Sequence, residues 1–223
     1  MIDLKEITKI YRSKKTDVLA LNEINLHIPQ NRFVLIKGPS GCGKSTLLFT
    51  IGGMLKPSSG ELEVMGKKPF RHSEKERTAF LSSQLGFVFQ SYYLVPYLTV
   101  LENILLPEKA GNKNITKEQA LEIAKELHID HRLLHKPSEL SIGEKQRVAL
   151  ARAFIIQPKV ILADEPTGNL DPGNTKEVLK HLEQFRKKGG TVVMVSHGNE
   201  ADALADITVT MNNGKIIEIN QNN

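Results

Sequence analysis

The sequence predicts an α/β fold, in which a mostly parallel β-sheet is covered by helices and a group of helices is inserted between its strands. Short apolar runs at 33–36, 160–163 and 191–195 are rich in Val, Ile and Leu. They alternate with segments of helical period, and from about 98 to 156 the helical pattern dominates. Strands buried on both faces of a parallel sheet carry such continuous apolar runs, so we assign these three runs to its core.

The part of the chain before residue 90 is predicted to supply strands and one helix. Two β-like stretches, 2–10 and 19–28, precede the first apolar run, and a helix is expected over 46–55. The composition of 57–70 indicates a turn, a strand and a second turn. A further strand is expected at 85–89.

The rest of the chain is predicted to supply helices and a final hairpin. Helical period predicts helices over 117–127, 144–155 and 175–188, the last lying between two core strands. Residues 207–219 are predicted to form a β-hairpin, because Asn213-Gly214 suits the left-handed turn that joins two antiparallel strands.

Length and composition suit one large domain, or one domain with a smaller lobe. The chain has 223 residues, of which 40% are hydrophobic and 25% charged. The net charge of +5 is spread without long basic blocks, which favours an ordinary solvated surface. The single cysteine cannot form an internal disulfide. The sequence has no signal-peptide core and no apolar run of about 20 residues, so we expect a protein that is soluble or held at a membrane by another component.

The most specific motif is GPSGCGKST at 38–46, which follows an apolar strand and precedes a helix. Glycines let backbone N–H groups turn inward around phosphate oxygens, and the helix N-terminus adds positive potential. Lys44 supplies a charge for the outer phosphates, and the Ser45 hydroxyl is short enough to ligate Mg²⁺. The predicted nucleotide-binding residues of this loop are Gly38, Ser40, Gly41, Cys42, Gly43, Lys44, Ser45 and Thr46, with Cys42 as a small loop residue rather than a redox group.

Two acidic residues follow a second core strand. The segment VILADEPTGNLD, at 160–171, brings Asp164 and Glu165 to the carboxyl end of the sheet, where ligands bind in folds of this class. There Asp164 can hold Mg²⁺ through water, and Glu165 can polarise an attacking water molecule. Acidic residues are also common at helix caps, so the pair indicates a metal and water site only in combination with the phosphate loop.

Two more polar side chains follow strand ends. His197 comes after the run at 191–195, and Gln90 follows the predicted strand at 85–89. A lone His is usually structural, but its place at a third strand end beside the same site makes His197 a candidate catalytic residue. Gln90 is a candidate for contact with the metal or the attacking water, and the other interpretation is a turn cap.

An apolar, tyrosine-rich patch comes directly after Gln90. Three of the four tyrosines in the chain, Tyr92, Tyr93 and Tyr97, lie here together with Leu94. Two interpretations remain open: packing between the core and the helical part, or a docking surface for another protein.

The segment LSIGEKQRVALAR, at 140–152, has the features of a second anion-binding helix start. Ser141, Gly143 and Glu144 precede a basic helix, whereas Ile142 stands where glycine is usual in such loops. Since a β-branched residue strongly disfavours a positive φ, we expect Ile142 to be helical or extended, with its side chain away from the anion. A carboxylate in the first turn suits the helix dipole but not a phosphate, so the Glu144 carboxylate should point elsewhere.

The phosphate loop, Gln90, the segment at 140–152, the acidic pair and His197 follow one another along the chain in this order. Together they resemble the ATP-binding cassette (ABC) ATPases over almost the whole chain. Within that superfamily, LADEPTGNLD and LGFVFQSYYLVPYLTVLENILLP are similar to the ATPase subunits of lipoprotein-release and macrolide-export transporters. The resemblance implies a single nucleotide-binding domain over 1–223, with a P-loop NTPase core and an N-terminal antiparallel β subdomain. The core would span about 1–90 and 157–223, and the helical subdomain about 91–156.

The resemblance also implies a composite site that binds ATP and Mg²⁺ between two copies of the chain. In this family two chains stack head to tail, so Ser141, Gly143 and Glu144 would bind the nucleotide of the partner copy. Tyr11 matches the aromatic residue that stacks on adenine, although an ordinary strand tyrosine has the same composition. Asp171 matches the loop that crosses the dimer interface. The metal site would use Ser45, Gln90 and Asp164.

The function implied is ATP hydrolysis that closes and opens a dimer and so powers export or extraction by a separate membrane subunit. That permease subunit would dock near Tyr92, Tyr93, Leu94 and Tyr97, which places the chain on the cytoplasmic face of the membrane as a peripheral protein, without a nucleic-acid partner. One alternative is a regulatory subunit that gates a membrane complex without transport. A DNA-maintenance ATPase is a weaker alternative, because only about 100 residues separate Lys44 from Ser141 and they hold no heptads. A P-loop kinase would leave Ser141 and His197 unexplained.

Overall fold

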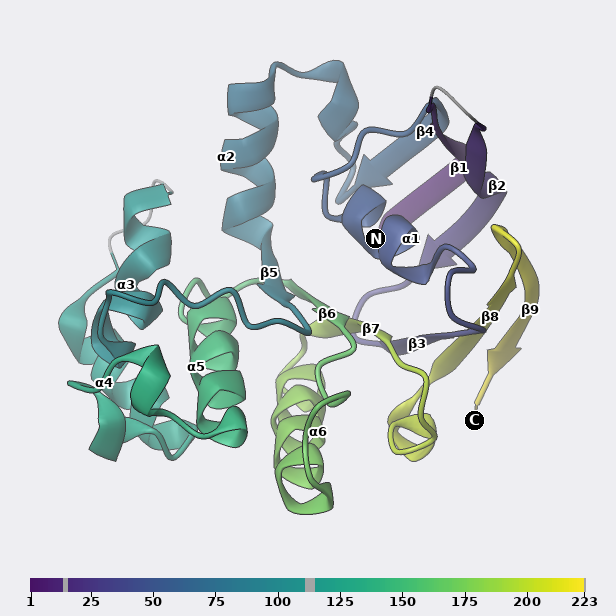
Figure 1. Cartoon of the computed structure of the whole chain (residues 1–223). Helices are drawn as coiled ribbons and strands as arrows, with labels where there is room; N and C mark the ends of the chain where they lie inside the picture. Colours follow the sequence, from purple (N-terminus) through teal and green to yellow (C-terminus); the bar gives the residue numbers. More distant parts are fainter. Residues whose placement is uncertain (14–15, 111–114, 223) are drawn as a thin grey trace.

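The computed structural model describes residues 1–13, 16–110 and 115–222 and places their strands in two sheets (Figure 1). The smaller sheet is antiparallel and the larger is mostly parallel, as predicted. The three strands of the smaller sheet, in spatial order, are β2 (Val18–Ile28), β1 (Ile2–Tyr11) and β4 (Ser59–Val64). The larger sheet has the order β5 (Leu85–Val88), β6 (Val160–Asp164), β7 (Thr191–Val195), β3 (Phe33–Lys37), β8 (Ile207–Asn212) and β9 (Lys215–Gln221).

The central strands of the larger sheet are buried on both faces, and successive residues enter two different cores. In β3, Phe33 and Leu35 pack on one face, while Val34 and Ile36 pack on the other. The same alternation holds in β6 and β7, as expected for a strand period of two. Helices therefore cover both sides of this sheet, which explains the continuous apolar runs.

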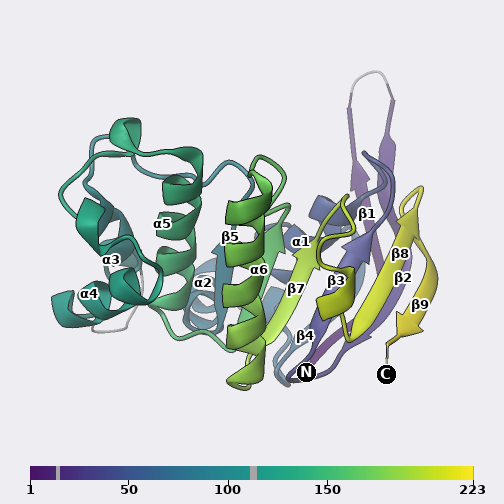
Figure 2. The ribbon, with the colours of Figure 1, turned by 90° about the horizontal axis from the view of Figure 1, so that it is seen from below.

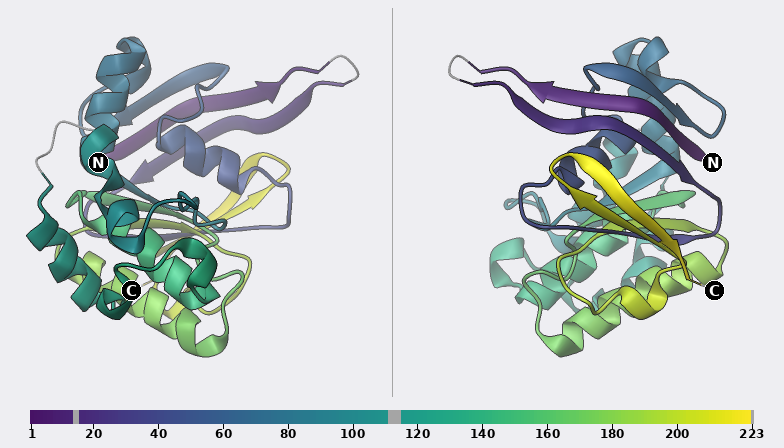
Figure 3. Two further views of the ribbon diagram at one scale, coloured as in Figure 1. Left: turned by 60° about the vertical axis from the view of Figure 1, so that its left-hand side comes forward. Right: turned by 90° about the vertical axis from the view of Figure 1, so that its right-hand side faces the viewer.

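One face is covered by α1 (Lys44–Ile51) and, beyond it, by the antiparallel sheet (Figure 3). The opposite face packs against α5 (Ile142–Phe154) and α6 (Pro172–Lys187). Two more helices, α3 (Val100–Ala110) and α4 (Lys117–Glu126), pack against α5 in a group beside the β5 edge of the sheet (Figure 2). The first helix and the fifth thus lie on different sides of the central sheet.

One helix, α2 (Glu74–Gln84), was absent from the sequence-based expectations. Its N-terminus is a capping box, in which Ser73 accepts from the Glu76 N–H and the Glu76 carboxylate accepts from the Ser73 N–H. Leu81 is its one buried residue, so the helix lacks the apolar stripe by which amphipathic helices are found.

Two predicted helix boundaries were also wrong. The helix expected over 46–55 ends at Ile51, because Gly53 has a φ of +68° that no helix continues. The helix expected from 175 begins three residues earlier at Pro172, where Asp171 caps its N-terminus. The predicted hairpin is confirmed: Asn213 and Gly214 have φ values of +46° and +75° between β8 and β9.

Candidate functional site

The loop between β3 and α1 has the geometry of a phosphate cradle. Gly43 precedes the helix with a φ of +105°, and Gly38 has a φ of +150° in a space where a Cβ would lie 2.2 Å from the Met211 carbonyl oxygen. Nζ of Lys44 donates to the carbonyl oxygens of Gly38 and Pro39, each at 2.9 Å. The Lys44 ammonium group is therefore held inside the loop. Phosphate oxygens bound there would take the place of the two carbonyl oxygens as its hydrogen-bond acceptors.

The remaining candidates of this loop divide into side chains that face the core and side chains that face the site. Cys42 is 4% exposed and packs in the core beneath the antiparallel sheet, so its thiol is a packing group, as expected. Oγ of Ser45 donates to Oδ1 of Asp164 at 2.8 Å, although the two residues lie far apart in sequence.

Ser45 and Asp164 together form a pair of oxygen donors of the kind that Mg²⁺ prefers. Burial raises the pKa of Asp164, and the neighbouring carboxylate of Glu165 raises it further, whereas the Ser45 hydrogen bond and the charges of Lys44 and His197 lower it. A cation at this point would relieve the repulsion between the two carboxylates, so the donor set fits a magnesium ion.

Glu165 and His197 meet at the carboxyl ends of β6 and β7. Nε2 of His197 lies 2.7 Å from Oε1 of Glu165. Glu165 has a φ of +45°, and its N–H donates to the Val195 carbonyl at 3.0 Å, which fixes the direction of its side chain. Gln90 lies on the same side of Gly168 as Glu165, because a Cβ built on Gly168 would lie 3.4 Å from its Nε2 and 3.7 Å from Oε2 of Glu165. The structure thus brings together the three side chains that the sequence placed after three different strands.

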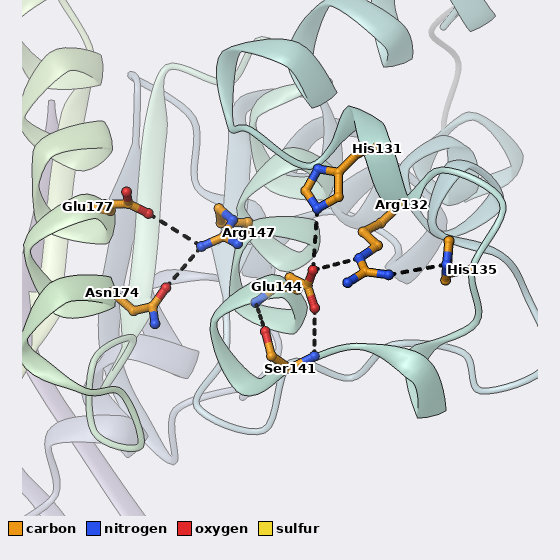
Figure 4. Close-up of polar contacts among 8 residues, drawn as sticks. All are labelled: His131, Arg132, His135, Ser141, Glu144, Arg147, Asn174 and Glu177. Carbon is orange, nitrogen blue, oxygen red and sulfur yellow. Dashed lines mark hydrogen bonds and ion pairs between the residues drawn. The ribbon is translucent and has the colours of Figure 1, made fainter.

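The second anion-binding segment is a helix N-terminus on the other side of the sheet. Ser141 is the N-cap of α5, and its Oγ accepts from the Glu144 N–H at 3.3 Å. Ile142 is the first helical residue and is 52% exposed, which confirms the expected helical conformation. The Glu144 carboxylate turns back onto the Ser141 N–H at 2.7 Å (Figure 4), and its expected direction away from a bound phosphate stays a prediction.

This helix N-terminus packs closely against the start of α6. A Cβ on Gly143 would lie 2.2 Å from Oδ1 of Asn174, so only glycine allows the contact. The same Oδ1 accepts from Arg147 at 2.9 Å, and the Asn174 amide donates to the carboxylate of Asp171. Hydrogen bonds from Asn174, first its N–H and then its side chain, hold the pKa of Asp171 below its usual range. Asn174 therefore links Asp171 to α5 within one chain, and Figure 4 shows its hydrogen bond with Arg147.

The glycine-to-isoleucine difference in this loop leads to a prediction. Replacing Ile142 with Gly should leave the ATP hydrolysis that the resemblance implies close to the wild-type rate, because the first helical position needs no positive φ. The cost should be about 0.5–1 kcal/mol of stability, measured by thermal unfolding. Gly143→Ala is the matched variant, and it should lose about 1–3 kcal/mol through overpacking against Asn174. A large gain in turnover for Ile142→Gly would mean that the wild-type loop is defective.

The tyrosine patch divides in the structure. Leu94 packs on the core, whereas Tyr93 and Tyr97 are 65% and 74% exposed. Tyr92 and Tyr93 have positive φ values, and the guanidinium of Arg152, on α5, donates to both of their carbonyl oxygens. Burial lowers the pKa of Arg152. Sequence reasoning missed Arg152, since nothing local distinguishes it from the other basic residues of the helix.

A groove of about 540 Å³ lies beside this patch, between the end of α1, α2, β5, α3 and α5. Apolar and aromatic residues dominate its lining, among them Met54, Phe87, Phe89, Tyr93 and Leu106. Phe87 and Phe89 stack with their ring centroids 5.3 Å apart, and Tyr93 meets Phe89 edge-on at 5.0 Å. The packing interpretation thus holds for Leu94, whereas Tyr93 lines the open groove and the docking interpretation stays a prediction.

Tyr11 lies apart from these groups, at the end of β1 in the antiparallel sheet. Its ring is 43% exposed, and Nζ of Lys9 lies 5.4 Å from the ring centroid. An exposed aromatic face of this kind is available for stacking. Among the described residues, no hydrogen bond or ion pair joins the phosphate loop to Ser141 or Asp171.

The fold and this arrangement of a phosphate loop with an acidic pair, a glutamine and a histidine define a nucleotide-binding ATPase of the P-loop class. The sequence matches the ABC transporter family over residues 21–168, and the chain belongs to that family. It is 40% identical over 220 residues to the lipoprotein-releasing system ATP-binding protein LolD of Geobacter metallireducens, covering 97% of this chain and 98% of LolD.

Two further relatives extend the comparison. The macrolide export ATP-binding/permease protein MacB of Chlorobaculum tepidum is 37% identical over 219 residues, which cover 98% of this chain but 34% of MacB. A dimeric structure of the ATP-binding cassette MJ0796 in a post-hydrolysis state, bound to ADP and Pi, superimposes with a TM-score of 0.93 at 35% identity. That match covers 99% of this chain and 98% of the cassette. The chain is thus an ATP hydrolase, the ATPase subunit of an ABC transporter of the LolD and MacB type.

No helix in the described part of the chain is both long enough and apolar enough to cross a membrane.

Proposed function

We propose that two copies of this chain close head to tail around two Mg·ATP molecules and that this cycle drives a separate membrane subunit to export or extract its substrate. The observation that carries the proposal is the separation of the two anion-binding helix starts. α1 packs on one side of the central sheet and α5 on the other, so one copy does not enclose a triphosphate with both. The dimeric state of the similar cassette MJ0796 supports the same arrangement.

In each site the phosphate loop would hold the nucleotide. Lys44, which now donates to two loop carbonyls, would turn its ammonium group to the outer phosphates. Tyr11 would stack on the adenine ring. Ser45 and Gln90 would ligate Mg²⁺ directly and Asp164 through water; the ion supplies neutralisation of phosphate charge.

Hydrolysis would use the pair at the ends of β6 and β7. Glu165 would orient a water molecule and accept its proton while the water oxygen bonds to the γ-phosphorus and the bridging oxygen leaves with ADP. His197, 2.7 Å from Glu165, would hold the water and the γ-phosphate in line. Glu165 and His197 already lie in contact without nucleotide. The charges that would stabilise the transition state are therefore in place before ATP binds.

The partner copy would complete the site. Ser141 and the N-terminus of α5 would contact the γ-phosphate of the nucleotide held by the other chain. Asp171 would lie at the seam between the copies, and its contact with Asn174 would tie it to the same helix. Loss of the γ-phosphate removes the group that both copies share, and the dimer opens.

The groove beside Tyr93 is the proposed docking site for a short cytoplasmic helix of the permease subunit. Its aromatic and aliphatic lining would receive the apolar side of such a helix. In this assembly the chain is a peripheral protein on the cytoplasmic face of the membrane. The chain matches 98% of LolD, which is named as an ATP-binding protein, whereas in MacB the matching region is about a third of an ATP-binding/permease chain.

The docking proposal predicts a selective loss of membrane binding. Tyr93→Arg places a charge in the apolar groove and should abolish co-sedimentation with the organism's own membrane vesicles, stripped of peripheral proteins. Basal ATP hydrolysis should stay near the wild-type rate, because Arg152 binds the Tyr93 backbone and not its ring. The control is Ile217→Arg on β9, which is 62% exposed at the far edge of the sheet and should bind vesicles normally. Equal binding by both variants would exclude this groove.

A further inference from the structure

The Glu144 carboxylate has three neighbours that together fix its position (Figure 4). Oε2 accepts from the Ser141 N–H at 2.7 Å, and Oε1 accepts from Nε of Arg132 at 2.8 Å. Nε2 of His131 lies 3.5 Å from the same Oε1. The glutamate is only 7% exposed, so nearly all of its surroundings are protein.

This carboxylate is a negative charge at an unfavourable place for an anion-binding loop. Burial acts to raise the pKa of Glu144, but the hydrogen bonds from the Ser141 N–H, from Arg132 and from the Ser141 hydroxyl outweigh it and hold the pKa at about 2. The group is therefore ionised at neutral pH. Without compensation this charge would repel a phosphate brought to the N-terminus of α5.

Arg132 supplies the compensation from outside the helix. It lies in the single turn Asp130–Arg132, ten residues before α5, and its side chain is 35% exposed. Another of its nitrogens, Nη1, lies 3.2 Å from Nε2 of His135, which fixes the plane of the guanidinium. The Arg132 guanidinium thus neutralises the charge of Glu144 and binds its Oε1, while Oε2 stays on the Ser141 N–H.

We propose that Arg132 is a positioning residue of the composite ATP site: it cancels the charge of Glu144 and so keeps the N-terminus of α5 favourable for the γ-phosphate bound by a second copy. The inference rests on the head-to-tail dimer of the proposed function. Arg132 itself touches no nucleotide. Its effect on the partner's site is electrostatic and passes through Glu144.

The test compares four variants in a Glu165→Gln background, which is expected to hold ATP without turnover. Arg132→Ala should raise the ATP concentration for half-maximal dimer formation roughly tenfold, as measured by light scattering. Arg132→Ala combined with Glu144→Gln should return it to the value of Glu144→Gln alone, since no charge is left to cancel. Arg132→Lys should retain most of the wild-type response, because it keeps the charge.

A second measurement separates this role from simple structural support. Each copy's own phosphate loop lies on the other side of the sheet, so Arg132→Ala should not change the affinity of the monomer for a fluorescent ATP analogue. If the double variant dimerises as poorly as Arg132→Ala, the guanidinium only supports the fold and the inference is overturned. A changed monomer affinity would overturn it too. If the Glu165→Gln protein binds ATP but forms no dimer even without further changes, the proposed function itself fails, a result distinct from both.

Discussion

Replacing Glu165 with Gln should lower ATP turnover by about 100-fold or more, because the amide cannot accept a proton from the attacking water. The same variant should accumulate as an ATP-bound dimer, since the shared γ-phosphate is no longer removed. Gln has nearly the size of Glu and can still hydrogen-bond to His197, so folding and nucleotide binding should persist. Steady-state phosphate release and gel filtration with and without ATP measure the two effects.

The matched control is Glu218→Gln, an exposed glutamate on β9 at the edge strand farthest from β5. It should hydrolyse ATP at the wild-type rate and show the wild-type dependence of dimer formation on ATP. Wild-type turnover by the Glu165 variant would remove that residue from the mechanism. His197 would then be the first group to replace.

Mixing two inactive variants should restore activity. Lys44→Ala removes the charge that binds the outer phosphates, and Ser141→Arg fills the helix tip that the partner's nucleotide needs, so each homodimer should be inactive. A mixed dimer has one site with both defects and one site with neither. An equal mixture should therefore regain roughly a quarter of the wild-type rate, because half of the dimers are mixed and half of their sites are intact.

The complementation result depends on both variants being folded. Ser141→Arg loses an N-cap, which should cost about 1 kcal/mol, so its thermal unfolding is measured in parallel. The mixture of Lys44→Ala with Lys44→Ala/Ser141→Arg is the control and should stay inactive, as no dimer in it has an intact phosphate loop. Full activity of Ser141→Arg on its own would contradict a site shared between copies.

The strands were predictable because burial on both faces left a signal in the local sequence. Each central strand is a short apolar run with a polar residue at its end or directly after it, and the phosphate loop follows one of them. The rule that ligands gather at the carboxyl ends of parallel strands then predicted a shared site for Glu165, His197 and Gln90, and in the structure Glu165 and His197 lie in contact. Helix α2 escaped the same reasoning because it buries one residue and owes its start to the cap at Ser73.

The supporting residues of the site could not be predicted from local patterns. Arg132, Arg152 and Asn174 act through contacts with segments remote in sequence, and each looks like an ordinary surface residue where it stands. The order of the strands in the larger sheet is likewise a tertiary property. Only the fold shows that Arg132 faces Glu144.

The rigidity of α5 has a mechanical consequence. Helix α5 has 13 residues and is about 20 Å long, with Ser141 at its N-terminus. Near its other end Arg152 donates to the carbonyl oxygens of Tyr92 and Tyr93, beside the groove. Its close contact with Asn174 lies near the Ser141 end. A permease docked at the groove, as proposed, would push on the Arg152 end of α5. A small rotation of the helix about the Asn174 contact would then move Ser141 into or out of the active site of the neighbouring copy.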